Sequence, residues 1–188
     1  MVTLDVHPDK IDPVVGAEVL RYVLDVPSAS PGDIDEALEL QGPAPIALVV
    51  SPGAGDGAVM SLRECAERAV DAGRSLVLPA DATEDDVADF QSYFAHTDAG
   101  YFACADDADG VVRVLACAVA GITGFDVRAA YREPDVDRLL SLTDLAADAV
   151  RELLLGVFVP DPMAVARELV ALGFAPGEPE DPDDGQRS

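Results

Sequence analysis

The sequence contains few basic residues, and lysine is nearly absent. Of 188 residues, 12 are basic and 36 are acidic, which gives a formal net charge of −24. Lys10 is the single lysine, and Asp outnumbers Glu by 25 to 11. A field of this sign repels phosphate backbones and anionic lipids, so we expect neither nucleic acids nor membranes as partners. The bias suggests a halophilic protein from a high-salt cytoplasm, where salt screens acidic self-repulsion. The alternative is the composition bias of a GC-rich genome.

The chain also lacks a long apolar run. The longest stretches without a charged residue are 40–55, which is interrupted by Gly and Pro, and 114–125. Neither offers the roughly 18 consecutive apolar residues that a membrane-spanning helix requires. Residues 1–5 show no basic segment followed by an apolar one, so no signal peptide is expected and we predict a cytoplasmic location.

Cysteine is scarce. The three cysteines, Cys65, Cys104 and Cys117, are odd in number and have no C-x-x-C spacing, which implies neither a disulfide framework nor a zinc site. We therefore predict no bound metal. Cys65 lies in a helical pattern and Cys117 in an apolar run that predicts a strand, so we expect both to be small buried hydrophobic residues.

Apolar residues make up 49% of the chain, which is enough to bury a core, and their spacing divides the chain into three parts. Residues 1–44 are predicted to form a helical hairpin with helices over Val14–Leu24 and Asp33–Leu40. Residues 45–176 are predicted to form an α/β domain. Residues 177–188 are acidic, contain two prolines, and are predicted to be a disordered tail.

Within the α/β domain, short apolar runs alternate with helical patterns. The expected strands are 46–50, 75–79, 101–104, 111–119, 122–127 and 152–159. The expected helices are 58–72, 84–95, 135–150 and 162–173. The pair Asp109-Gly110 is a strong turn signal, so 101–104 and 111–119 are expected to form an antiparallel hairpin, and Thr83 with Asp86 resembles a capping box. The predicted fold class is α/β, with a mixed central sheet and helices on both faces.

A shift of 77 positions sets residues 47–78 against 124–155 with nine identities. Two βαβα halves, 45–104 and 122–176, would explain this as an internal repeat. The alternative is that any two amphipathic units in an Ala-, Leu-, Val- and Asp-rich chain look alike.

A glycine-rich loop, Gly53-Ala54-Gly55-Asp56-Gly57, lies between the predicted strand 46–50 and the following helix. Glycine N–H groups and a helix N-terminus can hold a phosphate there, because no Cβ obstructs the ligand. The spacing matches neither the dinucleotide fingerprint nor the Walker loop, and Asp56 would repel a phosphate. The loop is therefore a candidate phosphate site, and a simple strand-to-helix turn is the alternative.

The segment Leu48-Val49-Val50-Ser51-Pro52-Gly53-Ala54-Gly55-Asp56-Gly57-Ala58, followed by a helix and the strand 75–79, resembles the acetyl-CoA-binding core of GNAT-type N-acetyltransferases. The run 164–174 is similar to the family's A-x-x-x-Y-x-x-x-G-F ending, although Glu168 or Leu169 occupies the tyrosine position. Pro52 stands where the family has Gln or Arg. The resemblance implies acetyl-CoA as cofactor, with its pyrophosphate held by the residues Gly53, Ala54, Gly55, Asp56, Gly57 and Ala58.

Enzymes of this family need a proton donor at the departing thiolate. Tyr93 and His96, in and just after the predicted helix 84–95, are the candidate catalytic residues. Tyr93 can instead be a core aromatic residue beside Phe90 and Phe94. His96 can instead interact with the helix C-terminus, where its charge is favourable.

Two functions therefore follow from the sequence. The first is an acyl-CoA-binding N-acyltransferase-like protein, active on a small-molecule or protein amine or with reduced or lost activity. The second is a non-catalytic structural or protein-interaction module on an α/β scaffold. Catalytic activity, the substrate and the formation of a homodimer are left open.

Overall fold

The computed structural model describes residues 3–4, 21–26, 29–42, 44–50 and 59–174. Within these residues the chain forms six strands and eight helices, which confirms the predicted α/β character. The strands are β1 (Thr3–Leu4), β2 (Tyr22–Val26), β3 (Ile46–Val50), β4 (Ser75–Leu78), β5 (Tyr101–Cys104) and β6 (Leu154–Phe158). The helices are α1 (Pro31–Glu39), α2 (Leu62–Asp71), α3 (Glu84–Phe94), α4 (Ala108–Thr123), α5 (Val127–Arg132), α6 (Val136–Leu140), α7 (Asp144–Leu153) and α8 (Pro162–Ala171). No described helix is long and apolar enough to cross a membrane.

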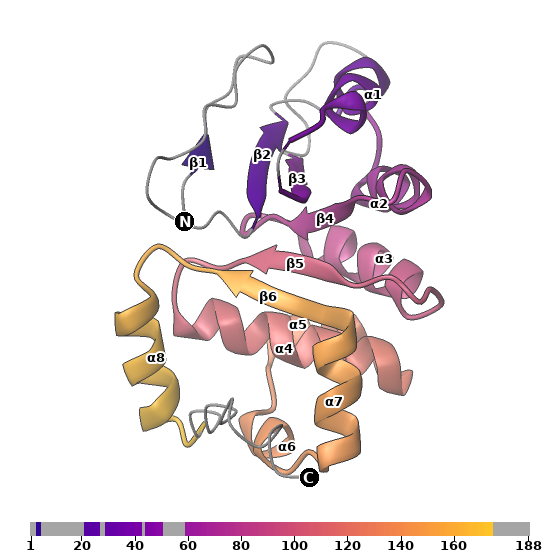
Figure 1. Ribbon diagram of the computed structural model, residues 1–188. Coiled ribbons are helices and arrows are strands. Elements are labelled where there is room, and N and C mark those ends of the chain that lie inside the picture. Colours follow the sequence, from indigo (N-terminus) through magenta and orange to yellow (C-terminus); the bar gives the residue numbers. More distant parts are fainter. Residues whose placement is uncertain (1–2, 5–20, 27–28, 43, 51–58, 175–188) are drawn as a thin grey trace, which may run out of the picture.

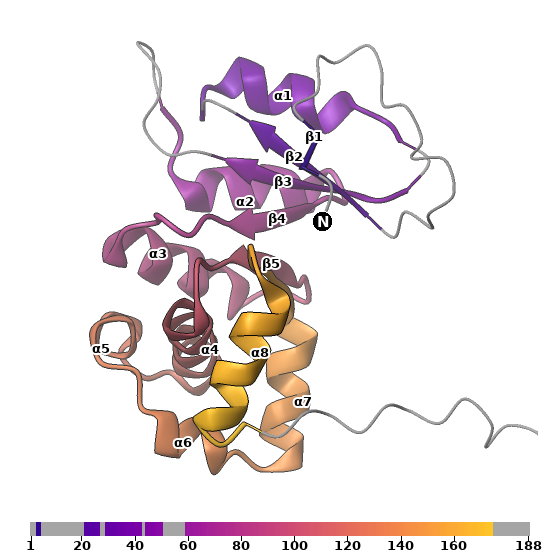
Figure 2. The same cartoon turned by 90° about the vertical axis from the view of Figure 1, so that its left-hand side faces the viewer.

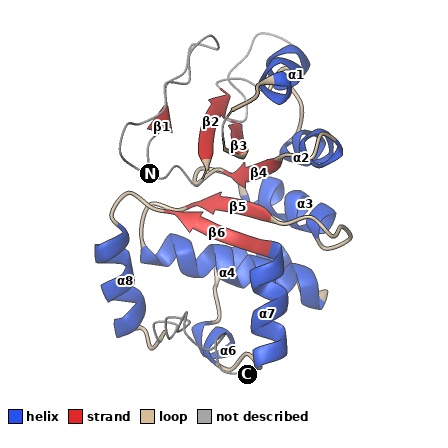
Figure 3. Cartoon of the chain, in the orientation of Figure 1, coloured by secondary structure: helices blue, strands red, loops and turns tan. Residues whose placement is uncertain are grey.

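The six strands form one sheet whose spatial order follows the chain, from β1 to β6. All five pairings are parallel, so the predicted mixed sheet is wrong for the described strands. Parallel crossovers are almost always right-handed, and crossovers that advance in one direction therefore place their helices on the same face. Figure 1 and Figure 3 show the helices along the outside of an arc of strands. The prediction of helices on both faces is wrong for the described helices.

The main core lies between the sheet and the helices, because alternate residues of each strand point to that face. Tyr22 lies beside Ile46, and Leu48 lies beside Leu76, in the register of β2, β3 and β4. These four residues are buried in one cluster with Phe90 of α3.

The other face of the sheet is concave. The guanidinium of Arg21, next to β2, lies 4.5 Å from the centre of the Phe102 ring in β5. Strands β2 and β5 are separated by three inter-strand steps. In a flat sheet their backbones would lie about 14 Å apart, so the contact between Arg21 and Phe102 indicates that the sheet curls. Phe102 also stacks on Phe158 of β6, with ring centres 5.4 Å apart. Figure 2 views the molecule from the side toward which this face opens.

Polar side chains define where the helices begin. Ser61 and Thr83 form capping boxes with Glu64 and Asp86, respectively. In each box the hydroxyl accepts a hydrogen bond from the N3 N–H, and the N3 carboxylate accepts one from the cap N–H. The predicted box at Thr83 is confirmed.

The predicted antiparallel hairpin is wrong, because residues 111–119 lie within helix α4. Asp107 caps this helix and accepts a hydrogen bond from the Gly110 N–H at 2.8 Å. The pair Asp109-Gly110, which predicted a turn, is therefore part of the first helical turn. Helix α4 contacts α3, α5, α7 and α8, so apolar residues cover most of its circumference and conceal the helical period.

Three further predictions are corrected. Residues 22–24, predicted to end a helix, belong to strand β2, which pairs with β3. Residues 122–127, predicted as a strand, contain the end of α4 at Gly124 (φ 70°) and the start of α5. The predicted helix 135–150 is divided into α6 and α7, because Thr143 caps a new helix.

The proposed internal repeat has no structural support in the described residues. It aligns 47–50, which form β3, with 124–127, which lie between two helices. Residues 14–20 of the predicted helix 14–24 and the tail 177–188 lie outside the described residues.

Candidate functional site

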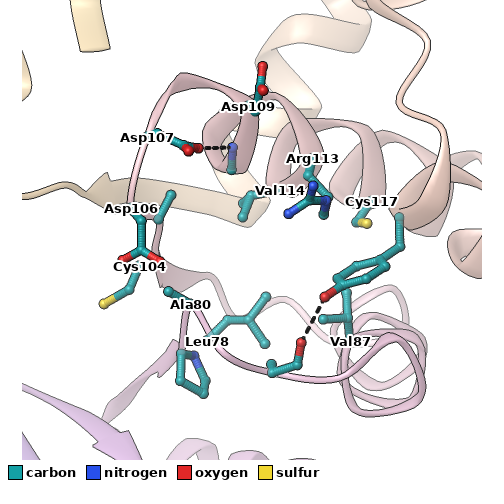
Figure 4. Close-up of a pocket in the computed structure, with 15 residues that line it drawn as sticks. Leu78, Ala80, Val87, Cys104, Asp106, Asp107, Asp109, Arg113, Val114 and Cys117 are labelled. Carbon is teal, nitrogen blue, oxygen red and sulfur yellow. Dashed lines mark hydrogen bonds between the residues drawn. The ribbon is translucent and has the colours of Figure 1, made fainter. Parts of the chain in front are cut away.

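A pocket of about 210 Å³ opens at the carboxyl ends of strands β4 and β5. Its walls come from the segments 78–82 and 104–107, which end and follow these strands, and from helices α3, α4 and α5. Ligands of parallel α/β proteins bind outside the carboxyl ends of the strands, where the loops can vary without disturbing the sheet. The position of this pocket makes it the candidate functional site (Figure 4).

The first turn of α4 forms one wall of the pocket. The Asp107 cap holds this turn, and a Cβ on Gly110 would lie 3.1 Å from the Ala105 Cβ. That distance is shorter than ordinary contacts between side-chain carbons. Glycine at position 110 therefore lets the helix approach the loop after β5 closely.

Arg113 extends from the second turn of α4 toward the hollow (Figure 4). Its guanidinium carbon lies 5.3 Å from the centre of the Tyr131 ring. The Tyr131 hydroxyl donates a hydrogen bond to the Ala82 carbonyl at 3.0 Å, which fixes the ring against the loop after β4. Among the described residues, no carboxylate lies within 4.0 Å of the Arg113 guanidinium nitrogens.

A guanidinium stacked on a ring keeps its N–H groups free, because they point outward in the plane of the group. From this position over the Tyr131 ring, Arg113 can offer two parallel N–H groups to a planar anion. Six ion pairs form among the described residues and engage five other arginines. Five described arginines form no ion pair, and Arg113 is the one among them that lines this pocket.

Two thiols also line the pocket. Burial raises the pKa of Cys117 to about 12, although the positive charge of Arg113 opposes this. Burial also raises the pKa of Cys104, and the carboxylates of Asp106, Asp25 and Asp81 act in the same direction. Both groups are therefore neutral thiols at pH 7, and a neutral thiol is a poor nucleophile. The expectation that Cys65 and Cys117 are buried is confirmed, with Cys117 in a helix rather than a strand.

The predicted catalytic residues lie away from this pocket. Tyr93 is near the end of α3, with its ring centre 5.2 Å from that of Phe94. Burial raises the pKa of Tyr93, and the charges of Asp71 and Glu67 on α2 add to this effect. The His96 N–H donates to the Tyr93 carbonyl at 3.0 Å. Helix α3 leads into the amino end of β5, so both residues lie at the edge of the sheet opposite the pocket.

The predicted cofactor-binding residues, Gly53 to Ala58, lie outside the described residues. The next helix, α2, carries Arg63 and Arg68, but Arg63 pairs with Glu67 and Arg68 pairs with Asp35. These two cations are therefore already neutralised by carboxylates. Binding of acetyl-CoA at the loop stays a prediction.

Sequence reasoning missed Arg113, Tyr131 and Asp106 as site residues. The sequence does carry the pattern of a loop between a strand and a helix at this place. Asp106-Asp107 follows a short apolar run and precedes a charge-poor segment of helical length. Interpreting 111–119 as a strand placed Arg113 in a sheet and hid this signal. In the described part of the chain, no three His, Cys, Asp or Glu side chains gather as metal ligands would.

Comparisons with family models, with curated proteins and with solved structures found no match to this chain.

Proposed function

We propose that this protein binds a small carboxylate-bearing metabolite in the pocket at the carboxyl ends of β4 and β5. The observation that carries the proposal is the Arg113 guanidinium, which is stacked on Tyr131, faces the hollow and has no carboxylate partner among the described residues. A carboxylate matches the planar N–H fork of arginine with two parallel hydrogen bonds.

The pocket favours a small ligand with a single negative charge. Its volume of about 210 Å³ is below the range of roughly 300–1,000 Å³ that is usual for drug-sized ligands. Asp106 and Asp107 line it, and their charges would repel a phosphate dianion more strongly than a carboxylate monoanion. The apolar surfaces of Leu78 and Val87 are suited to a short carbon skeleton.

The side chains of the pocket support binding rather than catalysis. Both thiols are protonated at neutral pH, and the Tyr131 hydroxyl already donates to the Ala82 carbonyl. Among the described residues, the pocket does not pair a nucleophile with a general base, which covalent catalysis would need. This proposal is closer to the non-catalytic alternative from the sequence than to the acyltransferase, which stays a prediction.

Isothermal titration calorimetry with purified protein tests the proposal. The titrants are propionate, isovalerate, alanine, valine, β-alanine and acetyl-CoA, each in dilute and in molar KCl. We expect at least one carboxylate to bind, and Arg113→Gln to weaken that binding by about tenfold or more. Arg167→Gln is the matched control, because Arg167 is exposed on α8 and its side chain donates a hydrogen bond to the Met163 carbonyl of the same helix at 3.1 Å.

Equal affinity of the wild type and the Arg113→Gln variant would overturn the proposal, as would the absence of binding for every carboxylate. Binding of acetyl-CoA alone, unaffected by Arg113→Gln, would overturn it in favour of the acyl-CoA prediction. Circular dichroism of each variant verifies that the fold is retained.

A further inference from the structure

Asp106 places a negative charge at the pocket that no described cation pairs with. It lies in the loop between β5 and α4, directly before the cap residue Asp107. The Asp107 carboxylate is occupied by the Gly110 N–H. No hydrogen bond or ion pair among the described residues engages the Asp106 carboxylate, whose negative charge acts on the Cys104 thiol.

Asp106 and Arg113 lie on different sides of the hollow. Figure 4 shows Asp106 beside Cys104 on one side and Arg113 beside Cys117 on the other, while Asp109 points away. The two charged groups are more than 4.0 Å apart, since they form no ion pair. Both side chains line the same pocket, so the pocket lies between the cation of Arg113 and the carboxylate of Asp106.

This separation selects between kinds of ligand. A simple carboxylate bound to Arg113 would bring a second negative charge near Asp106, and a simple amine near Asp106 would face the cation of Arg113. A molecule that carries both charges satisfies both groups, and each attraction is strengthened by partial removal of water. The apolar wall between them, which includes Val114 and Leu78, fits an aliphatic carbon skeleton.

We infer that the ligand is a small aliphatic amino acid, bound as a zwitterion with its carboxylate on Arg113 and its ammonium group on Asp106. This inference rests on the proposed function, because it requires that Arg113 bind the carboxylate. It adds that the ammonium group is recognised and that Asp106 is the residue that recognises it.

The test compares matched pairs of compounds that differ only by the amino group: valine with isovalerate, and alanine or β-alanine with propionate. We expect the wild type to bind an amino acid about tenfold more tightly than its partner without the amine. Asp106→Asn, which keeps the shape and removes the charge, should bring this ratio close to one. Asp109→Asn is the matched control and should leave the ratio unchanged. The comparison of β-alanine with alanine identifies the position of the ammonium group that the pocket prefers.

Two outcomes would overturn the inference and leave the proposed function intact: a ratio near one in the wild type, or an unchanged ratio in the Asp106→Asn variant while Arg113→Gln still weakens binding. If no carboxylate binds to the wild type, the proposed function fails, and the inference fails with it. The wild type and each variant are measured as full-length protein.

Discussion

The side chain of Tyr131, in α5, contacts both the loop after β4 and helix α4. Its hydroxyl bonds the carbonyl of Ala82 in the loop after β4, while its ring supports the guanidinium of Arg113 from α4. A lysine at position 113 would supply the charge without the planar fork, because an ammonium group cannot stack in this way. The orientation of Arg113 is therefore a property of three segments and not of one residue.

Gln91 and Tyr101 form a polar pair inside the core. Gln91 is fully buried, its amide group donates a hydrogen bond to the Tyr101 hydroxyl, and its Oε1 has no partner among the described groups. Removing one member of such a pair leaves the other unsatisfied, at a cost of about 1–3 kcal/mol, whereas replacing both with apolar groups is nearly neutral.

We expect Gln91→Leu and Tyr101→Phe each to lower the free energy of unfolding, and the double variant to recover most of the loss. Urea unfolding of the four proteins in a double-mutant cycle measures this. Additive losses would show that the pair does not act as a unit.

At the scale of elements, the sequence predicts best where an element has a polar cap or a strict period. Strands β3, β4 and β5 and helices α1 and α3 are found close to their predicted positions. Ser30 and Thr83 cap the two helices, Val- and Leu-rich runs form β3 and β4, and β5 begins with two aromatic residues. Helix α4 could not be recognised, because it is enclosed by its neighbours and lost the polar face that reveals a helical period. Its wrong assignment also kept Arg113 and Asp106 from being recognised as neighbours at one pocket.

The junction of β5 with β6 depends on Gly100, which precedes β5. A Cβ at this position would lie 2.8 Å from the Glu152 carbonyl oxygen and 2.8 Å from the Leu155 Cγ. The backbone oxygen cannot move away without shifting the end of α7 and the start of β6.

We therefore expect Gly100→Ala to destabilise the protein by about 1–3 kcal/mol, as overpacked sites do. Gly32→Ala in α1 is the control, because no atom lies within 4 Å of the added Cβ, and it should be neutral or slightly stabilising. Thermal unfolding of both variants gives the comparison. Equal stability of the Gly100→Ala variant and the wild type would contradict the close packing at this junction.

At the scale of the whole molecule, electrostatic repulsion is the dominant charge effect. The net charge is −24, and the six ion pairs among the described residues are solvent-accessible, so each contributes little to stability. Repulsion between the unpaired carboxylates opposes the compact state.

We expect the Tm to rise when KCl is increased from about 0.1 M to about 1 M, because the screening length falls from about 10 Å to about 3 Å. Sucrose at equal osmolality is the control, since it changes hydration without screening charge. A Tm that rises equally in sucrose and in KCl would show that charge repulsion is not the cause.

The order of the strands also bears on how the protein is made. Each strand from β2 to β6 pairs with the strand that precedes it in the chain, so its partner has already left the ribosome when it emerges. Sheets in which an early strand must wait for a late partner expose an unpaired strand throughout synthesis, and such exposure favours aggregation. Here the sheet can grow in the direction of translation, with one helix between successive strands from β2 to β5 and four helices between β5 and β6.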